Sequence, residues 1–315
     1  MTARAVGLLL GFAADRVLGD PQRLHPVAGF GNAAAALERR LYADSRARGA
    51  AHTAALVGAA IVLGVAAERA AKHPAARAGT TAVATWTVLG GRSLEREALA
   101  VDAHLVAGNL PAARERLTHL VGRDTSSLEA GEIARAVVES VAENTSDAVV
   151  APLLWGALAG VPGLLGYRAA NTLDAMVGHH NDRYERFGWA AARLDDLVNL
   201  PGSRFAGAAT LLAQPRTARA TVRAWRRDAA AHPSPNAGVV EATFAGALGI
   251  RLGGMNRYYG NRVEHRAVIG DGRAVRPEDI ARAARLARRV GIISAVVSAS
   301  GALLVARRSQ RVGMR

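Results

Sequence analysis

The sequence predicts an all-α, polytopic integral membrane helical bundle, and three observations support this fold class. Half of the 315 residues are hydrophobic and only 21% are charged, which excludes a disordered chain. Aromatic residues make up only 4%, so the apolar half consists mainly of Ala, Leu, Val and Gly, small residues that let membrane helices approach closely. Several uncharged runs approach the length of a membrane span. The alternative is a soluble all-α protein in which these runs are buried helices.

Composition also restricts the chemistry. The chain has no cysteine, which excludes disulfides, thiolate nucleophiles, iron–sulfur clusters and cysteine-ligated zinc. Its net charge of +14 comes from arginine, because Lys72 is the only lysine. The arginines stand in Ala-rich stretches with few aromatic rings, so we expect no nucleic-acid partner. Residues 92–147 carry six Arg against ten acids, a net charge of −4, and residues 204–289 carry sixteen Arg against six acids, a net charge of +10.

The expected helices follow the uncharged runs in chain order. They lie within a single membrane-embedded domain, 1–315, near residues 5–19, 53–70, 78–91, 148–167, 204–214 and 290–306. The second and third are separated by charged residues around His73 and Pro74, which predicts a helical hairpin. The last run covers about 25 Å at about 1.5 Å per residue, which suffices for a span if Arg307 and Arg308 reach the headgroups.

Residues 148–167 predict a broken or re-entrant helix. The run contains Pro152 and Pro162-Gly163 and lies between the two most polar stretches of the chain. A straight span would put those stretches on opposite faces of the membrane, whereas a broken helix is tolerated where its freed backbone groups face protein or water. The polar segments 92–147, 168–203 and 215–289 are then polar helical loops that contain the candidate catalytic residues.

The first polar stretch predicts a helix with one acidic face. The pattern Ser126-Ser127-Leu128-Glu129 is typical of a capping box, so a helix is expected to begin near it and run toward Asn144. Charged residues at three- or four-residue steps share one face of that helix: Glu132, Arg135, Glu139, Glu143 and Asp147. Such a stripe can be an ordinary solvated face. Beside a membrane, however, an acid without a partner is costly, and the same carboxylates would then be suitable oxygen ligands for a Mg²⁺ that also contacts phosphate.

The second polar stretch, residues 167–204, contains residue types that bind phosphate and metal. They are Arg168, Asn171, Asp174, His179, His180, Asn181, Asp182, Arg183, Arg193, Asp195 and Asp196. The adjacent histidines diverge by about 100° on a helix and therefore make a poor zinc pair. Asp195 and Asp196 also fit an ordinary helix surface.

The third polar stretch combines a loop with a basic helix. The segment 232–238, HPSPNAG, is not regular helix, and its backbone amides are suited to an anion. A basic face precedes it, formed by Arg216, Arg219, Arg223, Arg226 and Arg227 with Trp225. This face fits either anionic lipid or an anionic substrate. The chain has no Walker A or dinucleotide-binding glycine motif, so any nucleotide is held by another arrangement.

Six strings, in this order, resemble the integral-membrane adenosylcobinamide-phosphate synthase family of cobalamin biosynthesis, also called cobinamide synthase, of the CobD/CbiB type. They are DRVLGDPQRLHPV, GRDT, ESVAENTSDAVVAPLLW, NTLDAMVGHHNDRYERFGWAAARLDDLVN, HPSPNAG and GALGIRLGGMNRYYG. The resemblance extends from near Asp15 to about Asp279. The departures are mild, such as Ala148 where the family usually has Gly.

The resemblance implies an ATP- and Mg²⁺-dependent ligase. It would join the free propionate carboxylate of adenosylcobyric acid to aminopropanol or its O-phosphate, with the corrinoid as substrate and not as prosthetic group. The implied partners are these small molecules and the lipid bilayer of the inner (cytoplasmic) cell membrane, which the chain would cross several times. A homo-oligomer or an association with other corrinoid enzymes is compatible with this. The competing class is a membrane transport or scaffold protein without catalytic activity, although no inverted repeat favours it.

The resemblance and the charge pattern together suggest roles for individual residues. The catalytic carboxylates would be Glu139, Glu143, Asp147 and Asp174, of which Glu143, Asp147 and Asp174 would bind the metal. The nucleotide would be bound by Arg123, Arg168, Asn171, Arg193, Asp195 and Asp196. The aminopropanol phosphate or the corrinoid edge would be bound by His232, Ser234, Asn236, Arg257 and Tyr258. This hypothesis requires acids from distant stretches to converge around a divalent ion.

Overall fold

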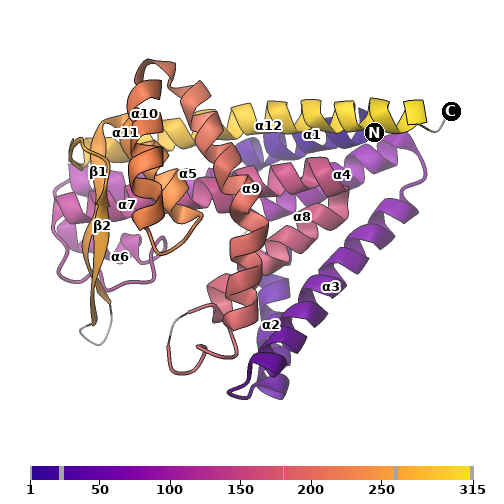
Figure 1. Ribbon diagram of the computed structural model, residues 1–315, viewed down its shortest axis with the longest axis horizontal. Coiled ribbons are helices and arrows are strands. Elements are labelled where there is room, and N and C mark those ends of the chain that lie inside the picture. Colours follow the sequence, from indigo (N-terminus) through magenta and orange to yellow (C-terminus); the bar gives the residue numbers. More distant parts are fainter. Residues whose placement is uncertain (1, 21–24, 180, 259–261, 313–315) are drawn as a thin grey trace. The chain divides into compact units, whose positions relative to one another are not determined.

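The computed structural model describes residues 2–20, 25–179, 181–258 and 262–312, with side chains except at 256–258, 262–265 and 305–312. The described chain is predominantly helical (Figure 1), which confirms the predicted all-α class. It divides into two compact units, which are described separately. Unit 1 comprises Met1–Gly90, Asp147–Gly202 and Ser294–Arg315, and unit 2 comprises Gly91–Ser146 and Ser203–Ile293.

Unit 1 is built from long helices. In chain order they are α1 (Thr2–Leu18), α2 (Pro26–Leu41), α3 (Arg46–Ala70), α4 (Pro74–Val88), α8 (Ala151–Val177), the first part of α9 (Trp189–Ala213) and the last part of α12 (Glu278–Val312). Helix α1 packs on α4, and α3 packs on α8 (Figure 1). Gly7 and Gly11 allow the first contact, because a Cβ on either residue would collide with Thr81 or Thr85 of α4.

Three described helical segments are long and apolar enough to cross a membrane: Arg46–Ala70, Ala130–Val177 and Glu278–Leu304. The outer surface of unit 1 agrees with this assignment. On α3, Val62 and Leu63 are 67% and 64% exposed, and on α12 Val296 is 54% exposed. Apolar side chains that face outward on long helices are typical of a lipid-facing surface. The chain is therefore an all-α membrane protein, as its composition predicts.

The broken helix predicted near 148–167 is confirmed. A π-helical turn, Ser146–Val150, precedes α8, and α8 itself breaks at Gly160, whose φ is 70° and ψ is −149°. The sequence pointed to Pro152 and Pro162-Gly163 as the helix-breaking residues, but the break lies between them, at Gly160. Pro162 occupies the first turn after the break, where its missing N–H is not needed.

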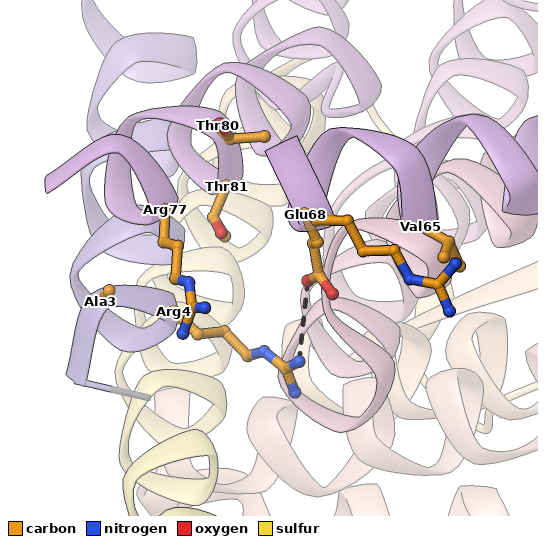
Figure 2. A pocket seen from close by; sticks show the side chains of 8 residues that line it. Ala3, Arg4, Val65, Glu68, Arg77, Thr80 and Thr81 are labelled. Atoms are coloured by element: carbon orange, nitrogen blue, oxygen red, sulfur yellow. Dashed lines mark ion pairs between the residues drawn. The ribbon is translucent and has the colours of Figure 1, made fainter. Parts of the chain in front are cut away.

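Two charged side chains satisfy the backbone groups that this break releases. Glu68 Oε1 accepts a hydrogen bond from the Val161 N–H at 2.9 Å, and Arg4 Nη1 donates to the Ala157 carbonyl at 3.3 Å. Figure 2 shows that Arg4 and Glu68 point toward one another, and their charged atoms lie 3.7 Å apart. They line a cavity of about 340 Å³ formed by α1, α3 and α4. The ion pair therefore compensates for the backbone hydrogen bonds that the helix loses.

Unit 2 is mixed. Its elements are α5 (Gly91–Val106), α6 (Leu110–Leu117), α7 (Ala130–Thr145), short 3-10 turns at Pro215–Thr217 and Ala229–Ala231, α10 (Ala218–Asp228), α11 (Ala237–Leu248), β1 (Ile250–Tyr258), β2 (Arg262–Ile269) and β3 (Arg273–Ala274), with the last part of α9 and the first part of α12. Helix α7 begins close to the predicted place, but its capping box is formed by Glu129 and Glu132 and not by Ser126 and Glu129: the Glu132 carboxylate accepts a hydrogen bond from the Glu129 N–H at 2.9 Å.

The three-stranded sheet of unit 2 corrects the prediction that residues 215–289 are polar helical loops throughout. Its strand order is β2-β1-β3, with β1 antiparallel to β2 and parallel to β3. Gly249, with φ 67°, ends α11 in the left-handed conformation, and the chain turns directly into β1. The Gly-rich segment around Gly253 and Gly254 lacks clean alternation of apolar and polar residues, so its sequence does not indicate a strand.

Candidate functional site

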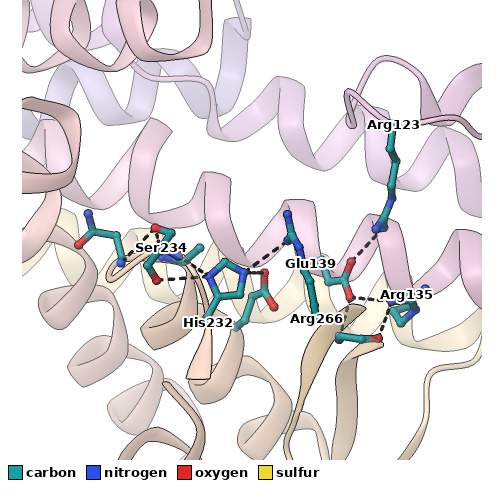
Figure 3. A network of polar contacts seen from close by, with 10 residues as sticks. Arg123, Arg135, Glu139, His232, Ser234 and Arg266 are labelled. Atoms are coloured by element: carbon teal, nitrogen blue, oxygen red, sulfur yellow. Dashed lines mark hydrogen bonds and ion pairs between the residues drawn. The ribbon is translucent and has the colours of Figure 1, made fainter. Parts of the chain in front are cut away.

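Glu139 on α7 is the centre of a buried polar network in unit 2 (Figure 3). Arg123 Nη2 donates to Glu139 Oε2 at 2.9 Å, and the Gly253 N–H donates to Glu139 Oε1 at 2.9 Å. Arg135 Nη1 lies 3.4 Å from the same Oε1. The side chains of Arg123 and Glu139 are 8% and 6% exposed. Both carboxylate oxygens of Glu139 are thus occupied, so Glu139 joins α7 to β1 through Gly253 and to the loop before α7 through Arg123.

Glu143, one turn further along α7, belongs to a second cluster. One ligand atom of each of Glu143, His232 and Glu241 lies within 4.8 Å of the others. His232 Nε2 is 3.5 Å from Glu241 Oε1, and these two side chains are 4% and 1% exposed. Glu241 is contributed by α11, whose residues are otherwise almost entirely apolar or small. Two carboxylates and one imidazole therefore share a water-poor environment.

The loop 232–238 fixes the orientation of His232. The Ser234 N–H donates to His232 Nδ1 at 3.0 Å, which leaves Nε2 facing Glu241. Ser234 Oγ accepts hydrogen bonds from the N–H groups of Asn236 and Ala237, at the first turn of α11. Asn236 Oδ1 in turn accepts from Ser203 Oγ at 2.9 Å. The polar residues that the sequence suggested for substrate binding thus also hold this loop together.

The charges around this cluster influence one another strongly. Burial raises the pKa of the Glu241 carboxyl, and the nearby Glu143 and Glu139 carboxylates raise it further. Burial also lowers the pKa of His232, and the Arg266 guanidinium, 3.4 Å from His232 Nε2, lowers it further. Both shifts act in the same sense, since each disfavours the charged form of its side chain relative to the same group in water.

Unit 1 contains most of the residues that the sequence suggested for binding the nucleotide and the metal. Asn171 Nδ2 donates to Asp195 Oδ1 at 3.3 Å, and Arg168 Nη1 donates to Asn171 Oδ1 at 3.1 Å. Asp147 Oδ1 accepts a hydrogen bond from Asn199 Nδ2. These contacts connect α8, and the π-helical turn before it, with α9, and we call these five residues the unit 1 polar cluster.

Asp174 also lies close to this cluster. Asp147, Asp174 and Asp195 all act electrostatically on the buried side chain of Tyr167, and Asp174 acts on Asp195 as well. The structure therefore brings together five of the predicted residues, namely Asp147, Arg168, Asn171, Asp174 and Asp195. Such a group of acids and amides presents oxygen atoms, which are the ligands that Mg²⁺ prefers.

Asp195 gives unit 1 a specific pH dependence. Burial, together with the nearby Asp174 carboxylate, raises the pKa of Asp195 from 3.8 to about 7. The folded state therefore holds this proton more tightly than the unfolded state. The contribution of protonated Asp195 to the free energy of unfolding is fully present below about pH 4 and is lost as the pH rises through about 7. We expect the thermal unfolding midpoint of the wild type to decrease as the pH is raised from 5 to 8, measured by tryptophan fluorescence in metal-free detergent buffer.

Asp195→Asn should flatten this dependence, because the amide does not ionise. Asp182→Asn, at an exposed position of unit 1, is the matched control and should keep the slope of the wild type. Equal slopes in wild type and Asp195→Asn would contradict the assignment.

The structure does not bring the other suggested residues together at one site. Arg193 is exposed and Asp196 is half-buried on α9. The side chains of Arg257 and Tyr258 lie outside the described residues. The three suggested metal ligands are divided, because Glu143 belongs to unit 2 whereas Asp147 and Asp174 belong to unit 1.

Sequence reasoning missed Glu241. The available signal was a lone acid in the otherwise apolar run GVVEATFAGAL, residues 238–248, since an ionisable side chain in such a run usually has a function. Arg266 was also missed, because its position depends on a strand that the sequence did not indicate.

Comparison with known proteins places this arrangement in a family. Residues 8–287 match the family model described as CobD/Cbib protein. The chain is 50% identical over 306 residues to "Cobalamin biosynthesis protein CobD" of Mycobacterium tuberculosis, covering 96% of this chain and 94% of that protein. Proteins of the same name from Rhodobacter capsulatus and Geobacter metallireducens are 43% and 44% identical, covering 90% and 86% of this chain and 93% and 88% of those proteins. No solved structure matches the chain.

The family match covers most of the chain and includes α7, α8, α9 and the loop 232–238, which carry both polar clusters. The relatives match along nearly their whole length, so the two polar clusters lie inside the shared region. This chain is a member of the CobD/CbiB protein family.

Proposed function

We propose that this chain is a cobalamin-biosynthesis ligase of the inner membrane, which it crosses several times. It would use ATP and Mg²⁺ to join the propionate carboxylate of adenosylcobyric acid to aminopropanol or its O-phosphate. Its relatives are named for cobalamin biosynthesis. The observation that carries the proposal is the unit 1 polar cluster, in which acids, amides and an arginine meet between apolar helices.

The unit 1 residues fit Mg²⁺ and a phosphate chain. Asp147, Asp174 and Asp195 offer oxygen ligands for Mg²⁺, and the half-buried Asp196 lies beside them in sequence. Arg168 Nε is buried and makes no hydrogen bond within the described part of the chain, so it is a donor available to a phosphate oxygen. When bound, Mg²⁺ would neutralise charge on the phosphates.

The two steps of the proposed reaction suggest roles for Arg168 and Asn171. A carboxylate does not condense with an amine at neutral pH, so the propionate oxygen would first attack the γ-phosphorus of ATP, giving an acyl phosphate and ADP. The amine nitrogen would then attack the acyl carbon, with loss of a proton and departure of phosphate. Both steps need phosphate oxygens held in place, which is the role we give to Arg168 and Asn171.

Arg123 and Glu139 receive a different role in this proposal. Because Arg123 and Glu139 are paired with one another, we assign Glu139 to positioning α7 and β1, and Arg123 to holding the Glu139 carboxylate, rather than to phosphate or metal. The loop 232–238 stays our candidate for the aminopropanol phosphate or the corrinoid edge.

The test is turnover by the purified chain in detergent. With adenosylcobyric acid, aminopropanol phosphate and Mg²⁺–ATP, we expect the amide product and one phosphate released per amide, and neither without ATP. Asp174→Asn should reduce turnover at least about a hundredfold, since it removes a charged ligand from the oxygen set, while the exposed Asp182→Asn should retain it.

Three outcomes would contradict this proposal. Amide formation that does not depend on ATP would exclude the ligase mechanism, and full activity of Asp174→Asn would exclude the unit 1 polar cluster as the nucleotide site. A folded chain that converts nothing under any of these conditions would favour the transport or scaffold class.

A further inference from the structure

We propose that Glu143, His232 and Glu241 in unit 2 form a binding site for a first-row transition-metal ion, separate from the Mg²⁺ that accompanies ATP. The three side chains offer two carboxylate oxygens and one imidazole nitrogen, with the ligand atoms within 4.8 Å of one another. Nitrogen and oxygen ligands lie roughly 2.0–2.2 Å from a Zn²⁺ ion, so two ligands of one ion are at most about 4.4 Å apart, which is close to this spread.

The burial of Glu241 is an independent observation that points to a ligand. Its side chain is 1% exposed, and neither carboxylate oxygen accepts a hydrogen bond from a nitrogen or hydroxyl donor in the described part of the chain. A buried carboxylate is usually compensated by such donors. Its neighbours include a second acid, Glu143, which lies close enough to share a proton with it and which repels it when both carboxyls are ionised. A divalent cation between the two acids would relieve both penalties.

His232 is oriented as metal-binding histidines are. Its Nδ1 lies 3.0 Å from the Ser234 N–H and 3.3 Å from the Ser234 carbonyl, so the same backbone residue satisfies Nδ1 in either tautomer. Nε2 is directed toward Glu241. When Nε2 binds a metal, Nδ1 carries the proton and would donate it to the Ser234 carbonyl, which is the arrangement that fixes the ring of a metal ligand.

The loop that carries His232 is held close to α11. A Cβ at Gly238 would lie 2.7 Å from His232 Cβ, so glycine at this position allows the loop and the helix to meet. The geometry of the site is therefore built into the backbone of unit 2.

The donor set also selects the ion. Mg²⁺ and Ca²⁺ prefer all-oxygen sites, whereas imidazole together with carboxylate suits Mn²⁺, Fe²⁺, Co²⁺ or Zn²⁺. Three protein ligands leave coordination positions open, and an anionic group of a small molecule would fill them. Arg266, whose Nη1 lies 3.4 Å from His232 Nε2 (Figure 3), is the competing cation, and the experiment must separate the two.

The experiment uses the full chain, purified in detergent without a histidine tag and stripped of metal with a chelator. Mn²⁺ alone is added, with no nucleotide or corrinoid, and free Mn²⁺ is counted by electron paramagnetic resonance. We expect one tightly bound Mn²⁺ per chain and a ¹⁴N modulation in the electron spin-echo signal from the imidazole. Zn²⁺ should displace it, whereas an equal concentration of Mg²⁺ should not.

Variants locate the ion. Glu241→Gln should weaken Mn²⁺ binding at least about tenfold, as loss of a ligand exceeds the effect of losing an outer contact. His232→Asn should abolish the ¹⁴N modulation. Glu95→Gln, at a buried acid of unit 2 outside the cluster, should leave both unchanged. If Glu241→Gln does not fold, Glu143→Gln replaces it.

Several results would overturn the proposal. A folded wild type that binds no Mn²⁺ would show that Arg266 and protons alone balance the acids. Bound Mn²⁺ without ¹⁴N modulation would place the ion on oxygen ligands elsewhere, for example at the unit 1 polar cluster. Because no substrate is present, these results are distinct from failure of the ligase assay.

Discussion

Gly160→Ala is expected to lower the stability of the chain by about 3 kcal/mol or more, through strain of about 1–3 kcal/mol and a comparable cost of overpacking. Gly160 has φ 70° and ψ −149°, a conformation that essentially only glycine adopts. A Cβ there would also collide with Glu68 Oε1 and would lie 2.6 Å from Arg4 Nη2. The added methyl group would therefore displace the two side chains that satisfy the broken helix.

The measurement is the unfolding midpoint in detergent by tryptophan fluorescence. Gly58→Ala is the matched control, because Gly58 lies in the long helix α3 with nothing within 4 Å of an added Cβ. Alanine there should be neutral or stabilise the helix by up to about 1 kcal/mol. Equal midpoints for the two variants would show that the break at Gly160 does not constrain the fold.

Glu139→Ala is expected to destabilise the chain by about 3–5 kcal/mol, which is the typical cost of removing one partner of a buried ion pair. Arg123, 8% exposed, would lose the carboxylate with which it pairs, and the Gly253 N–H would lose its acceptor. The readouts are the yield of folded protein in detergent and the thermal unfolding midpoint, and both should be lower than for the wild type.

The double variant Arg123→Met with Glu139→Leu separates charge from packing. It removes both charges at once, so it should recover part of the lost stability. Glu115→Ala, at an exposed acid of the same unit, should stay within about 0.5 kcal/mol of the wild type. A Glu139→Ala variant as stable as the wild type would mean that the network around Glu139 does not hold α7 to β1.

The acidic face of α7 shows what helical periodicity in the sequence can predict and what it cannot. Steps of three and four residues correctly aligned Glu139 and Glu143 on one side of a helix. They could not show that Glu139 is fully occupied by Arg123 and a β1 amide, whereas Glu143 meets His232 and Glu241. Partners from distant segments are determined by packing, and helical spacing contains no information about them.

The amino-acid sequence by itself determined the helical class, the break within 148–167 and the family. These properties depend on local quantities: hydrophobic run length, helix-breaking residues and short motifs that need no knowledge of distant neighbours. Tertiary structure alone decided the place of the break at Gly160, where Glu68 and Arg4 from other helices replace the lost backbone hydrogen bonds. It also decided the cluster of Glu241 with His232 and Glu143, because burying a charged side chain is tolerated only where the fold supplies a partner.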